Sequence, residues 1–353
     1  VQADPKLNKD NFEALANKEY FASDESQTLA NNADFTAAMQ PLQSDPATSV
    51  YCDVRGILAL AHQIEAAQSP SDLPQFDLGV KLYGFDSFKF LGLTGGFNGA
   101  DFQTDAFLGV DNAAEKLSGT MMQMYLPTQT LTNQDYQLVP ASVAQAYIGS
   151  ANFDHYLDNL VSLMAGSTPQ TSPQEFQAQI AQVNQSLGLD VQKDLLSPLS
   201  GAWAVYQSVD ANGVLSDPVV VHPLADGAAF SATLAKVYAQ INTMLQAEGV
   251  PVAITHLTSG DVPYDTLALP LPGIAPTVSV YKNKFILGFS TQAVLDAAAQ
   301  DNTNTPLNSN PDLLAIEQKL GVPNSLTTVE YIESRKVVAD LLNYTRQTIL
   351  PIL

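Results

Sequence analysis

Residues 140–150, PASVAQAYIGS, begin the stretch of sequence that decides the fold. The apolar residues from Val143 to Ile148 predict a short strand. From about Ala151, apolar residues recur at the spacing of one helix face, which predicts an amphipathic helix. The residues on this face are Phe153, Tyr156, Leu157, Leu160, Val161 and Met164. Because other elements must cover such a face, the strand and the helix together predict a unit that packs into a larger fold.

The same order of strand and helix occurs twice more, towards the two ends of the chain. One copy, PATSVYCDVRGILALAHQI, starts at Pro46, and the other, PNSLTTVEYIESRKVVADLLNY, starts at Pro323. Pro46 and Pro140 lie roughly 90 residues apart, and Pro140 and Pro323 about twice as far, as expected for a repeated module. The copies share few side chains, so the prediction of an internal repeat depends on this spacing.

Hairpins separated by helices predict an α+β protein, with curved antiparallel or mixed sheets packed against amphipathic helices. The clearest hairpin spans residues 88–110 and turns through Asn98-Gly99, a pair suited to a type I′ turn. A second hairpin spans residues 277–289 and turns at Asn283. We therefore expect sheets built largely from neighbouring strands.

Two helices have clear signals in the sequence. Ser172, Pro173 and Glu175 suit the first turn of a helix, and Gly188 suits its end. The strongest helix signal lies at about residues 228–247, where apolar residues recur at helical spacing.

The chain is predicted to contain a polar N-terminal extension followed by two α+β units, or by one continuous domain. The extension covers residues 1–44, the first unit residues 45–168 and the second unit residues 169–353. The boundary between the units is placed at the polar stretch GSTPQTSPQE, because serine, threonine and proline interrupt the apolar periodicity there.

Acidic residues dominate the charge of the protein. The chain carries 15 basic and 36 acidic residues, for a formal net charge of −21. Such a field repels phosphate backbones and anionic membrane surfaces, which argues against nucleic-acid binding. It favours a basic partner or cations, and incidental calcium at the surface is compatible with it. No apolar run approaches the roughly 20 residues that span a bilayer, so no transmembrane segment is predicted.

Cys52 is the only cysteine, which excludes an intrachain disulfide. Its place in a strand-like run predicts a buried thiol. The first residues, VQADPKLNKD, do not have the pattern of a signal peptide, and we interpret them as the end that remains after its removal. Two sequons, at Asn184 and Asn343, fall on predicted helices and leave glycosylation open.

The common catalytic and cofactor motifs are missing from the sequence. There is no G-x-S-x-G nucleophile motif, and the glycine-rich TGGFNG lacks the Lys and Ser/Thr of a phosphate-binding loop. The histidines are dispersed, without the paired spacing typical of zinc sites. They are His62, His155, His222 and His256. We therefore predict no catalytic, cofactor-binding or metal-binding residue and no enzyme activity, with dispersed carboxylates that meet in space as an open alternative.

Aromatic residues form the candidate surface for a protein partner or an apolar ligand. Four lie in or beside the first hairpin, and three lie in the N-terminal extension. They are Phe85, Phe88, Phe90 and Phe97, and Phe12, Tyr20 and Phe21.

The stretch DLLSPLSGAWAVYQSV and the following HPLADGAAFSATLAKV resemble an uncharacterised family of exported bacterial proteins known only as a domain of unknown function. The matching residues are Asp194, Leu195, Leu196, Leu199, Gly201, Trp203, Asp226, Phe230 and Leu234. Ser200 and Ala202 depart from the Gly and Glu that are common in that family. The resemblance covers most of residues 46–349. It implies an α+β fold and export beyond the cytoplasmic membrane, and it supplies no catalytic residues.

Together these observations predict a non-catalytic extracytoplasmic protein, a structural or interaction component of a cell-surface or periplasmic assembly. Its partner is expected to be another protein or a second copy of the chain. A soluble binding protein for a lipid or another apolar ligand is the alternative, because sheets packed on amphipathic helices can enclose a cavity.

Overall fold

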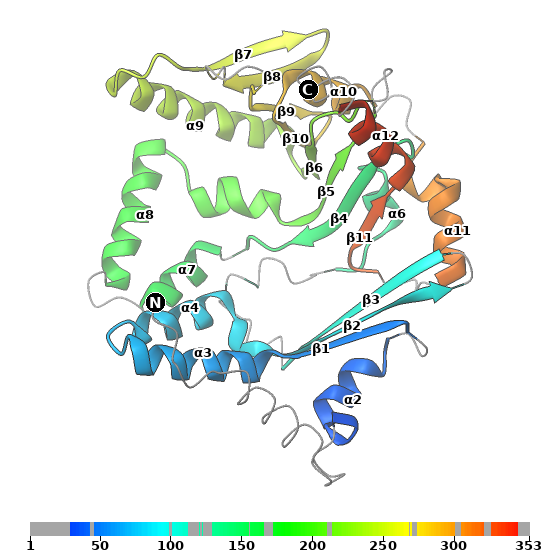
Figure 1. Ribbon diagram of the computed structural model, residues 1–353. Helices are drawn as coiled ribbons and strands as arrows, with labels where there is room; N and C mark the ends of the chain where they lie inside the picture. The colour runs from blue at the N-terminus through cyan, green and yellow to red at the C-terminus, as the bar shows by residue number, and fades with distance from the viewer. Residues whose placement is uncertain are drawn as a thin grey trace, which may run out of the picture. The chain divides into compact units, whose positions relative to one another are not determined.

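A computed structural model describes most of the chain after its N-terminal residues (Figure 1). The described residues are 29–42, 46–98, 101–111, 120, 122, 129–154, 156–165, 172–209, 214–267, 269, 274–300, 305–320 and 326–344. The contacts divide the chain into two compact units, Val1–Thr120 and Met121–Leu353. Both contain antiparallel strands and helices, which confirms the predicted α+β class.

The first unit contains a three-stranded antiparallel sheet in the order β1-β2-β3. Its strands are β1 (Thr48–Asp53), β2 (Phe88–Asn98) and β3 (Asp101–Val110), and its helices are α2 (Ala33–Met39), α3 (Val54–Gln68) and α4 (Leu73–Tyr83), with short 3₁₀ turns at Leu29–Asn31 and Phe85–Ser87. Asn98 pairs with Asp101, so the predicted hairpin is confirmed. Asn98, expected in the turn, lies in β2, and Gly99 lies outside the described residues.

Part of the predicted N-terminal extension belongs to the first unit. Asn32 caps α2 through its side chain, and Ala38 of this helix is fully buried. A Cβ atom on Gly92 of β2 would come within 3.0 Å of Ala38 O, so a glycine there allows α2 to approach the sheet. Phe12, Tyr20 and Phe21 lie outside the described residues.

The second unit contains an eight-stranded antiparallel sheet in the order β11-β4-β5-β6-β10-β9-β8-β7. Its strands are β4 (Gln145–Ala151), β5 (Gly201–Gln207), β6 (Val219–Pro223), β7 (Ile254–Ser259), β8 (Val262–Leu267), β9 (Thr277–Tyr281), β10 (Lys284–Gly288) and β11 (Val329–Ile332). The helices are α6 (Asn133–Tyr136), α7 (Tyr156–Ala165), α8 (Pro173–Leu187), α9 (Gly227–Ala247), α10 (Thr291–Ala299), α11 (Pro311–Leu320) and α12 (Ser334–Tyr344). A π-helical turn (Val191–Leu196) and 3₁₀ turns at Ser197–Leu199 and Leu307–Ser309 complete it.

The expected boundary after residue 168 does not coincide with the division into units. β4 precedes residue 168 and β5 follows it, yet the two strands pair along their whole length, from Gln145 opposite Gln207 to Ala151 opposite Gly201. The strands that precede and follow residue 168 therefore belong to one sheet.

The large sheet carries an apolar core on each face. On one face, Ile148, Ala204, Val221 and Ile286 pack with Val294 of α10 in the main hydrophobic cluster. On the other face, α9 contributes Phe230 and Leu234, which pack with side chains of β9, β10 and the turns before β5. Burial of both faces is the main stabilising contribution expected for a sheet between helices.

The start of the central helix differs from the sequence prediction. β4 begins at Gln145 and α7 at Tyr156, later than the expected Val143 and Ala151. The reason is tertiary. Phe153 N donates to Ser200 Oγ at 2.9 Å, Gln192 Nε2 donates to Phe153 O at 2.7 Å, and Gln192 Oε1 accepts from Leu157 N at 2.8 Å. These bonds tie Phe153 and Leu157 to another part of the chain and give the first turn of α7 a hydrogen-bond acceptor.

All three predicted strand–helix pairs are present as local structure, namely β1 with α3, β4 with α7 and β11 with α12. The first belongs to the three-stranded sheet, whereas β4 and β11 are neighbours in the eight-stranded sheet. The three pairs therefore share the same order of strand and helix, but they do not occupy equivalent positions in the fold. None of the described helices has the length and apolar character required to cross a bilayer.

Candidate functional site

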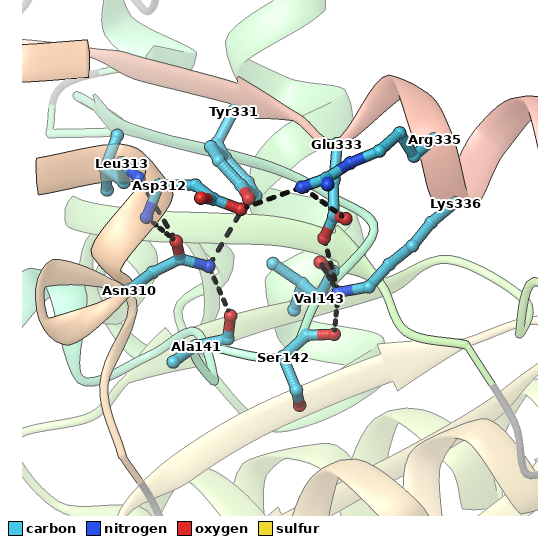
Figure 2. Close-up of polar contacts among 10 residues, drawn as sticks. All are labelled: Ala141, Ser142, Val143, Asn310, Asp312, Leu313, Tyr331, Glu333, Arg335 and Lys336. Carbon is cyan, nitrogen blue, oxygen red and sulfur yellow. Dashed lines mark hydrogen bonds and ion pairs between the residues drawn. The ribbon is translucent and has the colours of Figure 1, made fainter. Parts of the chain in front are cut away.

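A polar cluster in the second unit joins segments that lie far apart in the sequence (Figure 2). We call it the Asn310 cluster, after a residue that is only 6% exposed. The Asn310 side chain donates to Ala141 O at 2.6 Å and to Tyr331 Oη at 3.3 Å. Its Oδ1 accepts from the backbone N–H groups of Asp312 and Leu313, at 2.9 and 3.1 Å, and so caps α11.

The first turn of α12 forms the other half of the Asn310 cluster. Lys336 Nζ donates to Ser142 O at 3.0 Å and to Val143 O at 3.2 Å, and it pairs with Glu333 at 2.6 Å. Figure 2 shows Arg335 beside the same carboxylate, with an N–O distance of 3.6 Å. A more exposed ion pair, Arg335–Asp312, closes the cluster at 3.2 Å.

The hydrogen bonds of this cluster indicate a structural role. Both N–H groups of the Asn310 amide have acceptors, and its oxygen accepts twice, so its hydrogen-bonding capacity is used. Lys336 has three donors and reaches three acceptors. A buried polar group with all partners present stabilises one chain arrangement. The cluster therefore holds α11, β11 and α12 against residues 141–143.

This cluster was not predicted from the sequence. The signal was present in Asn310-Pro311-Asp312, since Asn is favoured at the N-cap and Pro at the first position of a helix. The contacts to Ala141 and Tyr331 had no comparable signal, because they join distant parts of the sequence.

His222 is the most enclosed titratable group with a clear perturbation. It lies in β6, is 3% exposed, and its Nε2 donates to Pro198 O at 3.1 Å. Burial lowers the pKa of His222 below its ordinary value of 6.5, while contacts with the backbone of Pro198 and Ala202 act in the opposite direction. The neutral ring is therefore the form that fits the fold.

Acidification through the range below pH 6.5 is expected to reduce the stability of the second unit through His222. The unfolded chain binds a proton near pH 6.5, whereas the folded chain binds it only at lower pH, so the contribution is fully present above 6.5 and lost as the pH falls. Urea unfolding between pH 7.5 and 5.5 measures this slope. His222→Gln should flatten the slope. Equal slopes in the native protein and in His222→Gln would contradict the assignment.

The other described histidines each lie beside an aspartate. His62 in α3 is 3.3 Å from Asp77, and His256 in β7 is 2.9 Å from Asp265, both at the surface. His155 lies outside the described residues. Within the described ranges, no three His, Cys, Asp or Glu side chains come together as ligands for a metal ion.

The aromatic residues of the first hairpin do not form one surface. Phe88 and Phe90 are buried, and Phe90 packs near Phe107 with a ring-centre distance of 6.0 Å. Phe97 is 71% exposed, and Phe85 is exposed beside Tyr83. The first two therefore build the core of the first unit, and only the last two are available at its surface. Cys52 of β1 is half-buried rather than enclosed.

Helix α3 presents an apolar face that sequence reasoning assigned to the core. Ile57, Leu60 and Ile64 recur at helical spacing and are 56%, 57% and 45% exposed. None of the described α3 residues is buried. We call Ile57, Leu60 and Ile64 the α3 face. Its side chains are apolar, aligned and accessible.

The residues that carry the family resemblance are largely packing residues. Leu195, Leu199, Phe230 and Leu234 lie in the hydrophobic cluster between α9 and the sheet. Asp226 caps α9 by accepting from Ala229 N at 2.9 Å. Their roles concern the fold, and the expected export remains a prediction from the resemblance. Comparisons of the chain with protein-family models, with curated proteins and with solved structures gave no match.

Proposed function

We propose that this protein is a non-catalytic interaction component of an extracytoplasmic assembly and binds a basic protein partner through the α3 face. The observation that carries the proposal is the exposure of three aligned apolar side chains, Ile57, Leu60 and Ile64, on a helix without a buried residue in its described part. Contiguous apolar side chains at a surface are typical of sites that bind another protein.

The charge of the chain supports a basic partner over a second copy. Each copy carries a formal charge of −21, so two copies repel one another, whereas a basic protein is attracted. Burial of three half-exposed aliphatic side chains contributes about 3 kcal/mol, which is less than the roughly 8 kcal/mol of a micromolar complex. Charge complementarity and further contacts are needed to supply the difference, which favours a partner of opposite charge.

The extracytoplasmic location is part of the same proposal and is supported by the resemblance to exported bacterial proteins. Separation of the compartments of the source cells, followed by immunodetection of the native chain, tests it. We expect the chain outside the cytoplasmic membrane, and its recovery with cytoplasmic proteins would contradict the proposal.

Site-specific photocrosslinking in the source cells tests the partner. A benzophenone amino acid at Leu60 is expected to give one adduct with a basic protein, and the same amino acid at the exposed Val183 of α8 should not give it. In a binding assay with the purified partner, Leu60→Ser should weaken the affinity about tenfold through lost apolar burial. The exposed Val183→Ser serves as the matched control and should bind normally.

Three outcomes would contradict the proposal. They are an adduct between two copies of this chain, identical adducts from positions 60 and 183, and unchanged affinity of the Leu60→Ser protein. A lipid that co-purifies with the native chain in mass spectrometry, and occupies the α3 face instead of a protein, would favour the apolar-ligand alternative.

A further inference from the structure

A set of side chains on the large sheet forms a pocket that the proposed function does not use. Adjacent residues of a strand point to opposite faces, and the register of β11, β4 and β5 places the side chains of one face in rows. Glu330, Tyr147 and Val205 form one row, and Ile332, Gln145 and Gln207 form the next. With Pro218 they line a pocket of about 230 Å³. We call it the Tyr147 pocket.

The ring of Tyr147 forms an aromatic wall of this pocket. A Cβ atom on Gly149 would lie 2.8 Å from the Tyr147 ring, so the ring lies against the strand where glycine leaves room. Trp203, opposite Gly149, supports the ring with a centre-to-centre distance of 5.2 Å. Tyr147 is nevertheless 36% exposed. One side of the ring is thus fixed by packing, and another side is open to a ligand.

The polar groups of the Tyr147 pocket are mainly acceptors. Gln207 Nε2 donates to Ser216 O at 2.8 Å, and Gln207 Oε1 accepts from Gln145 Nε2. This chain of bonds orients the Gln145 amide and leaves its Oε1 as an acceptor. The exposed Glu330 carboxylate lies in the row beside Tyr147, and it forms no hydrogen bond within the part of the chain that the structure describes. A complementary ligand must therefore supply donors.

We propose that the Tyr147 pocket binds the guanidinium group of an arginine side chain presented by a basic protein partner. A guanidinium stacks on an aromatic face and is attracted by its negative quadrupole. It also donates several hydrogen bonds in one plane, which suits the Glu330 carboxylate and Gln145 Oε1 on neighbouring strands. The volume of about 230 Å³ is below the roughly 300 to 1,000 Å³ typical of drug-sized ligands, so it suits one side chain.

Charge complementarity favours this occupant over a neutral or anionic group. The chain has a net charge of −21, and the only ionised side chain that lines the pocket is the carboxylate of Glu330. An ammonium group would be attracted too, but it is a compact charge that does not match a flat ring and two separated acceptors. The geometry thus selects arginine over lysine.

This inference shares one assumption with the proposed function, namely that the partner is a basic protein, which here supplies the guanidinium group. The pocket lies in the second unit and the α3 face in the first, so they can be tested separately. A small probe, L-argininamide, tests the pocket without the partner, and the photocrosslinking at Leu60 tests the partner without the pocket.

Calorimetric titration of the full chain with L-argininamide is the decisive experiment. We expect saturable binding with a Kd of about 1 mM, as suits a single side chain. L-citrullinamide has nearly the same shape but no charge and should not bind, and L-lysinamide should bind about tenfold more weakly. Trp203, the only tryptophan, lies beside Tyr147 and should change its fluorescence over the same concentrations.

Variants separate the pocket from general attraction to an acidic surface. Tyr147→Ala and Glu330→Gln should each weaken L-argininamide binding five- to tenfold, whereas Tyr147→Phe should retain it. Glu248→Gln removes the same charge from the end of α9 and should have no effect. The proposal is overturned if citrullinamide binds as well as argininamide, if Glu248→Gln and Glu330→Gln weaken binding equally, or if neither titration nor Trp203 fluorescence detects binding.

Discussion

Replacement of Asn310 with alanine is expected to lower the free energy of unfolding of the second unit by about 3 kcal/mol. The change removes the cap of α11 and leaves Ala141 O and Tyr331 Oη without the donor that they have in the fold. Loss of an N-cap costs about 1 kcal/mol, and a buried acceptor without a partner costs about 1 to 3 kcal/mol. These contributions act together because Asn310 is buried.

Urea unfolding followed by Trp203 fluorescence measures this loss, since the only tryptophan lies in β5 of the same unit. Asn308→Ala is the matched control. Asn308 belongs to the neighbouring 3₁₀ turn, and its side chain makes one exposed hydrogen bond to Asn133 at 3.2 Å. We expect its loss to cost less than about 0.5 kcal/mol. A similar cost for both variants would show that the Asn310 cluster does not stabilise the unit.

Replacement of Gly109 with alanine is expected to destabilise the first unit by about 2 kcal/mol. Gly109 pairs with Phe90 across β2 and β3, and a Cβ atom there would lie 2.5 Å from the Phe90 ring. Phe90 is buried beside Tyr51 and Phe107, so its ring has little room to move. The added methyl group must therefore displace the ring or separate the strands.

Hydrogen exchange of the amides in β2 and β3 measures this effect, because these strands form the centre and one side of the small sheet. Gly79→Ala is the control in the same unit. Its Cβ would meet nothing within 4 Å, and alanine is favoured over glycine in a helix such as α4. We expect faster exchange in Gly109→Ala and unchanged or slower exchange in Gly79→Ala. Unchanged exchange in both would contradict the packing role of Gly109.

Elements with signals inside one short segment were predicted well from the sequence. Ser172 and Glu175 form the expected capping box of α8, and Gly188 ends this helix with a φ of 62°. Asn283 lies at the predicted turn between β9 and β10, with a φ of 57°. Each depends on a few consecutive residues, so local hydrogen bonds and backbone preferences are sufficient.

The candidate sites were predicted poorly, because they are made of residues from separate elements. Phe88 and Phe90 were expected at a surface, yet cross-strand packing in the first unit buries them. The Asn310 cluster joins residues 141–143 to α11 and α12. The Tyr147 pocket needs β4 to lie between β11 and β5. The periodicity of apolar residues predicts on which face of a strand or helix a side chain lies. It does not predict which other element packs against that face.

The amino-acid sequence by itself determined the α+β class, both ends of α8, the turn at Asn283 and the strong negative charge, because these follow from local patterns and from composition. Only the tertiary structure decided which strands are neighbours, where the chain divides, and that α3 exposes its apolar face while Asn310 is buried. The physical reason is that burial and hydrogen bonding between distant segments depend on the whole arrangement, which no single stretch of the chain contains.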